Sequence, residues 1–196
     1  EGRQLVLSVK GGHNGEHHNH NDVGAFIVHW RGESLICDLG RGEYVKDFFG
    51  PRRYEYLTTR SLGHDVPLVN GVEQGVGRAF ASRDFRAEVT AEAACAEMEL
   101  ADAYPAEAGL RSLHRRVILH RGREECVELE DRMEFAGPQR CYELPLYTRG
   151  RFEDAGAGKV RVRGEHESLH IEFDPAVVEV RLEQVDHGDR ALERRH

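Results

Sequence analysis

The sequence has no apolar run of about 18 residues, the length that a membrane-spanning helix requires. Its first residues also lack the basic start and long apolar centre of a secretory signal peptide. Positive charge is in deficit, because 27 Lys and Arg stand against 35 Asp and Glu, which gives a net charge of −8. Proteins that bind nucleic acid or anionic membranes concentrate Lys and Arg to meet phosphate. We therefore expect neither nucleic acid nor a membrane as a partner.

Cysteine is scarce and widely spaced, so it says little about the chemistry of the protein. The four cysteines lack the paired CxxC spacing of a zinc ribbon, and each sits in an apolar or alternating segment. We expect free thiols buried on strands rather than disulfides, which leaves the redox compartment open. The cysteines are Cys37, Cys95, Cys126 and Cys141.

Short runs that alternate apolar and polar residues recur along the 196 residues, separated by Gly-, Pro- or charge-rich breaks. A period of two is typical of antiparallel strands, and 39% hydrophobic residues suffice for a sizeable core. Because no Pro/Ser linker divides the chain, we predict a single all-β domain over residues 1–196. The expected architecture is a two-sheet antiparallel β-sandwich with few or no helices. The runs are QLVLSV, AFIVHW, SLICDL, LVNGV, RVILH, CVELE, YELPLY, KVRVRG, SLHIEF and VVEVRL.

Three breaks between these runs predict hairpin turns, near Arg31–Gly32, Arg121–Arg123 and Gly164. Residues 89–100 are rich in Ala and Glu, which favours helix by propensity alone. Alternation leads into this segment, so we predict a strand there. Residues 44–60 are predicted to hold a short helix or an irregular loop.

Histidine is in excess: four of the 12 histidines lie between residues 13 and 20, in the segment GGHNGEHHNHNDVG. This segment adds almost nothing to a core and needs another reason to be ordered. Imidazole and carboxylate groups suit zinc, and the i, i+2 spacing of His18 and His20 places two side chains on one face of a strand. A solvated polar loop is the alternative interpretation.

Two further polar residues border apolar segments. Asp38 ends the strand LICDL, where an unpaired charge would be costly to bury. His64 precedes a short apolar strand that closes on the turn dipeptide Asn70–Gly71. A lone histidine in this position is more often a loop or core residue than a ligand, and the interest of His64 comes from His20 and Asp38. We expect Asn70 and Gln74 to serve the turn rather than bind a sugar.

A metal site shared by Asp38 and the histidine cluster requires a sharp bend in the chain. A hairpin that turns at Arg31–Gly32 places Asp38 beside Phe26, and His20 then lies about 20 Å further along a straight strand. We therefore predict that the chain folds back at residues 22–24, where Gly24 permits the bend.

Three ordered segments, HNHNDVG, ICDLGRGEY and HDVPLVNG, resemble the C-terminal β-sandwich region of the heparinase II/III-like polysaccharide lyases. The resemblance covers residues 10–80 well and the later strands only by type. It implies that His18 is a catalytic histidine that points at substrate instead of binding metal. Asp65 departs from the family pattern, in which Asn more commonly follows the ligand histidine. The zinc ligands that the resemblance implies are His20, Asp38 and His64.

The resemblance also implies β-elimination of a polysaccharide that contains uronic acid. The C5 proton is removed, charge builds on the adjacent carboxylate, and the departing C4 oxygen is protonated. His18 suits the base or a donor to the carboxylate. Tyr44 and Tyr54 both suit the phenolic group, and either could instead pack under the loop. Three arginines suit a substrate carboxylate, because a guanidinium can hold a carboxylate with two hydrogen bonds. Solvated surface residues are the alternative interpretation of these arginines, which are Arg41, Arg52 and Arg53.

The N-terminal (α/α) toroid of that family has no counterpart in this chain. We expect the chain to be the C-terminal domain of a longer bacterial lyase, inactive without the upstream toroid, whose substrate is an acidic polysaccharide or oligosaccharide. The alternative is a non-catalytic carbohydrate-binding β-sandwich with a structural metal. A cupin-like metal enzyme fits less well, because cupins take their ligands from two separated motifs. A homodimer, and either a periplasmic or a cytoplasmic location, are compatible with the sequence.

Overall fold

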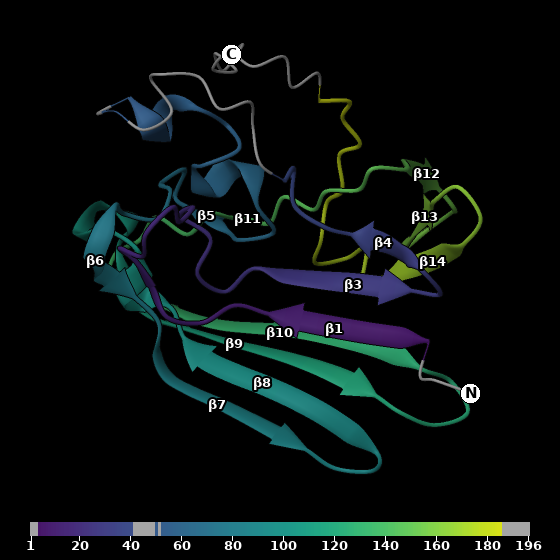
Figure 1. Cartoon of the computed structure of the whole chain (residues 1–196). Helices are drawn as coiled ribbons and strands as arrows, with labels where there is room; N and C mark the ends of the chain where they lie inside the picture. Colours follow the sequence, from purple (N-terminus) through teal and green to yellow (C-terminus); the bar gives the residue numbers. More distant parts are fainter. Residues whose placement is uncertain (1–3, 41–49, 51, 186–196) are drawn as a thin grey trace.

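Two antiparallel sheets form the main layers of the protein in the computed structural model, which describes residues 4–40, 50 and 52–185. One sheet has the strand order β1-β3-β4 and the other β10-β9-β8-β7. Figure 1 shows β1 and β3 lying along β9 and β10. The predicted all-β sandwich is confirmed. The strands are β1 Leu5–Val9, β3 Phe26–Trp30, β4 Glu33–Ile36, β7 Arg83–Val89, β8 Ala93–Glu99, β9 Leu110–His120 and β10 Cys126–Phe135.

Smaller antiparallel sheets complete the described part of the chain. They consist of β12-β13-β14, of β11 with β5, and of β2 with β6. Helical structure in the described residues is limited to short 3-10 segments, and none of them is long and apolar enough to cross a membrane. The bounds are β2 His13–Asn14, β5 Leu68–Val69, β6 Gly77–Ala81, β11 Tyr142–Glu143, β12 Arg151–Asp154, β13 Lys159–Arg163, β14 Ser168–Glu172, η2 Arg53–Glu55, η3 Ser61–Gly63, η4 Ala101–Ala103 and η5 Ala106–Ala108.

Two apolar clusters form the core. One cluster packs the inner faces of β1, β3 and β4 against β9 and β13, through residues such as Leu35, Leu119 and Val162. The other joins Val23, at the end of the histidine-rich segment, to Met98 and Leu113 on β8 and β9. The histidine-rich segment is thereby anchored on the four-stranded sheet, because burial of large apolar side chains is the main stabilising contribution to such a core.

The predicted hairpins are confirmed. Strands β3 and β4 pair across Arg31 and Gly32, which have φ angles of 46° and 95°. Strands β9 and β10 pair across the turn that follows His120, and β13 and β14 pair across the turn at Gly164. The Ala- and Glu-rich segment is strand β8, as predicted. Its pairing with both β7 and β9 outweighs its helix propensity.

The predicted strand VVEVRL is wrong: residues 177–182 lie in no strand. Asp174 starts a turn in which its carbonyl accepts hydrogen bonds from the amides of Val177 and Val178, at 3.0 and 2.9 Å. The chain then runs on without a β partner, and the apolar side chains of this segment stay exposed. Alternation alone does not make a strand, because a strand is stabilised by its pairing with a neighbour.

The cysteine prediction is correct only in part. All four cysteines are free thiols, and Cys37 is buried. Cys126 and Cys141 are exposed, because Cys126 is the first residue of β10 and Cys141 lies just before β11. The apolar neighbours of these two residues indicated burial, but the ends of strands lie close to solvent.

Candidate metal centre

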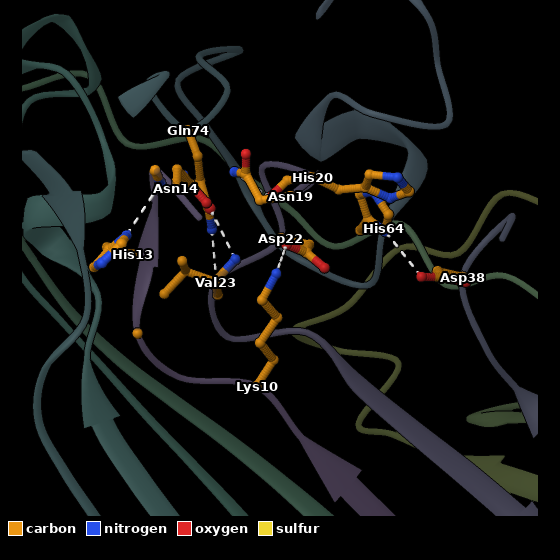
Figure 2. A network of polar contacts seen from close by, with 12 residues as sticks. Lys10, His13, Asn14, Asn19, His20, Asp22, Val23, Asp38, His64 and Gln74 are labelled. Carbon is orange, nitrogen blue, oxygen red and sulfur yellow. Dashed lines mark hydrogen bonds and ion pairs between the residues drawn. The ribbon is translucent and has the colours of Figure 1, made fainter. Parts of the chain in front are cut away.

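Buried amide side chains order the histidine-rich segment that links β2 to β3. The Nδ2 of Asn14 donates to Oε1 of Gln74 at 3.1 Å and to the carbonyl of Gly75 at 2.9 Å. Gln74 also holds Val23, accepting from its amide at 3.1 Å and donating to its carbonyl at 2.7 Å (Figure 2). One glutamine thus fixes both ends of the segment, so the segment is not a solvated loop. Gln74 serves this segment rather than a turn, which corrects the prediction for it.

The predicted bend is confirmed at Gly24, whose φ is 91°. The amide of Gly24 donates to the carbonyl of Lys10 at 2.8 Å, and the amide of Ala25 donates to the carbonyl of Asp22 at 3.0 Å. The ammonium group of Lys10 pairs with the Asp22 carboxylate across the bend (Figure 2). These contacts direct the residues before Asp22 toward the end of β4 instead of along the axis of β3.

Alanine in place of Gly24 is expected to lower the free energy of unfolding by about 1–3 kcal/mol. The left-handed backbone disfavours any side chain, and an added Cβ would lie 2.8 Å from Cδ1 of Leu100. Chemical denaturation measures the loss. Gly12→Ala is the matched control, because Gly12 has a φ of 95° but no atom within 4 Å of its added Cβ. An unchanged stability of Gly24→Ala would contradict the expectation.

The bend brings together the three residues predicted as metal ligands. One ligand atom each from His20, Asp38 and His64 lies within 4.8 Å of the others. The His20 and His64 rings are 5.1 Å apart between centroids, and Nδ1 of His64 lies 3.2 Å from Oδ2 of Asp38 (Figure 2). The ligands come from three segments: the histidine-rich segment, the residues after β4 and the residue after η3.

The protonation of the triple suits a metal ion. Burial, with a smaller contribution from His64, lowers the pKa of His20 to about 4, so its imidazole is neutral at pH 7. The adjacent His64 lowers the pKa of Asp38 against the effect of burial, and Asp38 is ionised. Neutral imidazole and ionised carboxylate are the forms that bind metals.

His64 provides a second argument for a metal. The residue has no exposed surface, its Nδ1 faces only the Asp38 carboxylate at 3.2 Å, and its Nε2 has no hydrogen-bond partner in the described part of the chain. Buried polar atoms without a partner are rare and costly. Donors about 2.0–2.2 Å from a tetrahedral zinc lie about 3.4 Å from one another, so small side-chain rotations would suffice. The three residues therefore fit a metal ion.

Asp65, the residue that departs from the family pattern, binds a later segment of the chain through its carboxylate. Its Oδ1 accepts the amide of Tyr147 at 2.9 Å, and the Tyr147 hydroxyl donates to the carbonyl of Leu62. The amide of Cys37 donates to the Tyr147 carbonyl at 3.0 Å. Burial raises the pKa of Asp65 well above its usual range. Asp65 thus fixes the chain around Tyr147 between the segments that provide Asp38 and His64.

The 3-10 helix η2 lies against the histidine-rich segment. Arg53 donates from Nη2 to the carbonyl of Asn19, and the Tyr54 hydroxyl donates to Oδ1 of Asn19 at 3.1 Å. Asn19 is buried between His18 and His20, whereas His18 is exposed with a φ of 57°. The structure thus brings Arg53 and Tyr54 beside the residues predicted to bind metal and substrate.

The remaining predicted site residues are less informative. Tyr44 and Arg41 lie outside the described residues, so the structure does not choose between Tyr44 and Tyr54. Arg52 is exposed and forms an ion pair with Glu55 at 2.8 Å. Asn70 serves its turn as expected, with a φ of 53° and with its Oδ1 accepting the amide of Cys141 at 2.8 Å.

The comparison with protein families agrees with the geometry of the site. The family model described as "Heparinase II/III-like, C-terminal" matches residues 1–190. A search of curated proteins finds no match to the chain. The family match spans nearly the whole chain, including the His20, Asp38 and His64 triple and the strands that follow it. The chain therefore belongs to the heparinase II/III-like family and corresponds to the C-terminal domain that this family model describes.

Proposed function

We propose that this chain is the zinc-binding domain of a polysaccharide lyase that cleaves glycans containing uronic acid by β-elimination. The observation that carries the proposal is the convergence of His20, Asp38 and His64, with the exposed His18 two residues before His20 in the chain. The activity requires a helical toroid domain upstream, and the glycan lies between the two domains. The single sandwich domain of residues 1–196 provides one wall of that cleft.

Zinc, when bound to His20, Asp38 and His64, would supply a fixed positive charge that holds three chain segments together. The other residues have the chemical tasks. His18 accepts the C5 proton or donates a hydrogen bond to the uronate carboxylate, because the ring nitrogens of an exposed imidazole can take either role. The guanidinium of Arg53 donates to the carbonyl of Asn19, the residue after His18, and suits the negatively charged substrate.

A phenol suits the protonation of the departing C4 oxygen. The hydrogen bond of the Tyr54 hydroxyl to Asn19, the residue next to His18, supports Tyr54 for this role. Tyr44 is the other candidate for the phenol, and Arg41 is a further contact for the substrate carboxylate. Replacement of each tyrosine by phenylalanine assigns the role, because only the loss of the proton donor lowers the turnover number while substrate affinity stays.

The proposal is tested on the full-length protein with any sequence that precedes Glu1. Purified without added metal, it should contain about one zinc per chain, because three protein ligands are enough for a zinc site with an open position. With a uronate polysaccharide it should release products that absorb ultraviolet light through a new C4–C5 double bond. Chelation with EDTA should remove the metal and lower the melting temperature. Absence of bound metal, or absence of unsaturated products, would refute the proposal.

A non-catalytic carbohydrate-binding module with a structural metal is the second candidate. The complete burial of His64 supports it, since structural zinc sites are closed. This candidate predicts bound zinc and bound glycan in the full-length protein without any unsaturated product. The same assay therefore separates the two functions.

A further inference from the structure

Arg115, in the middle of β9, is completely buried although it is charged. It lies directly opposite Asp131 of β10, and Nε and Nη2 donate to the two carboxylate oxygens at 2.9 and 2.7 Å. Burial alone would lower the pKa of Arg115, but the Asp131 carboxylate raises the pKa above its ordinary value. Arg115 therefore stays charged inside the protein.

The other side of the same guanidinium reaches the segments that hold the metal ligands. Its Nη1 donates to the carbonyl of Gly24 at 2.8 Å and to the carbonyl of Asp65 at 3.0 Å. Gly24 is the bend that follows His20, and Asp65 is the residue directly after His64. One side chain from the four-stranded sheet thus connects the two segments that provide the histidine ligands.

The guanidinium has the number of donors that this position needs. Nε and one Nη2 hydrogen donate to the Asp131 carboxylate, and the two Nη1 hydrogens donate to the carbonyls of Gly24 and Asp65. Nη2 also lies 3.5 Å from the hydroxyl of Tyr142. Lysine has three donors on one atom and cannot form this planar fork. Replacement by lysine would therefore leave buried carbonyls without a partner, although it would keep the charge.

We propose that Arg115 is a positioning residue that sets the separation of His20 and His64 and thereby the affinity of the centre for its metal. The metal part of this inference rests on the proposed function, whereas the separation of the two rings does not. Residues that orient metal ligands from outside the coordination shell typically change metal affinity about 10–100-fold.

The experiment compares Arg115→Lys with the unchanged chain. The variant should bind zinc about 10–100-fold more weakly, and its cobalt-substituted form should show a changed visible spectrum, because that spectrum reports ligand geometry. Val162→Ala is the matched control for lost packing, since Val162 is fully buried in the other core cluster. It should lower the melting temperature but retain zinc affinity and the cobalt spectrum.

A second measurement needs no metal. The ring protons of His20 and His64, whose centroids are 5.1 Å apart, should give a nuclear Overhauser effect that Arg115→Lys loses and Val162→Ala keeps. If Arg115→Lys does not fold, the variant that combines Arg115→Gln with Asp131→Asn replaces it, because no unpaired charge is then left buried.

The outcomes separate the two proposals. The positioning role would be overturned if the Arg115 variant kept the zinc affinity, the cobalt spectrum and the ring contact of the unchanged chain. Equal losses in the Val162→Ala control would overturn it as well, because they would reflect stability alone. If the unchanged chain binds no metal, the proposed function fails, and the ring contact still decides the role of Arg115.

Discussion

Replacement of His20 by alanine is expected to abolish stoichiometric zinc binding. In the described part of the chain, the candidate site consists of three residues whose ligand atoms lie within 4.8 Å of one another. Loss of His20 leaves only two of these ligands. The affinity should fall by more than the roughly 100-fold that outer-shell residues cost. With zinc at about a thousand times its dissociation constant, the unchanged chain gains about 4 kcal/mol of stability and about 10 °C in melting temperature. The variant should gain neither.

His17→Ala is the matched control for this loss. His17 lies in the same segment and is exposed, but it does not belong to the group of converging ligand atoms. Metal analysis and thermal unfolding with and without EDTA provide the measurements. A His20→Ala chain that retains zinc, or a His17→Ala chain that loses it, would mean that the metal binds elsewhere in the cluster.

Replacement of His18 by asparagine is expected to lower the lyase activity of the full-length protein by about 10²–10⁴, the usual contribution of a general acid or base. Asparagine is chosen because His18 has a φ of 57°, and asparagine tolerates this left-handed conformation well. The change thus removes the imidazole without adding backbone strain. The readout is the rate of unsaturated product formation.

Zinc content shows whether that loss is chemical. The His18→Asn protein should retain its zinc and its melting temperature, because the residue is exposed and lies outside the ligand triple. His17→Ala, one residue away, should retain both zinc and activity. Full activity in His18→Asn would exclude His18 as a catalytic group, and loss of zinc in that variant would make it a ligand.

Local sequence patterns account for most of the fold. Alternation predicts β8 correctly despite its Ala- and Glu-rich composition, because cross-strand pairing with β7 and β9 outweighs helix propensity. The same rule fails for residues 177–182, which pair with no strand in the described part of the chain. Whether an alternating run pairs depends on its neighbours in space, and a single sequence does not contain that information directly.

The candidate site is predictable to the extent that its residue types are distinctive. His20, Asp38 and His64 stand out by chemistry and order, and Gly24 by the geometry of the bend. The supporting residues do not stand out. Gln74 and Arg115 act on backbone carbonyls of segments far away in sequence, and a carbonyl has no side-chain signature.

The three ligands lie within the first 64 residues, whereas Arg115 belongs to the second half of the chain. During synthesis the ligands therefore emerge long before β9, whose guanidinium is the partner of the Gly24 and Asp65 carbonyls. The metal centre is thus not an autonomous folding unit. In a nascent chain that ends before β9, the Gly24 and Asp65 carbonyls would lack the guanidinium that joins them in the folded protein.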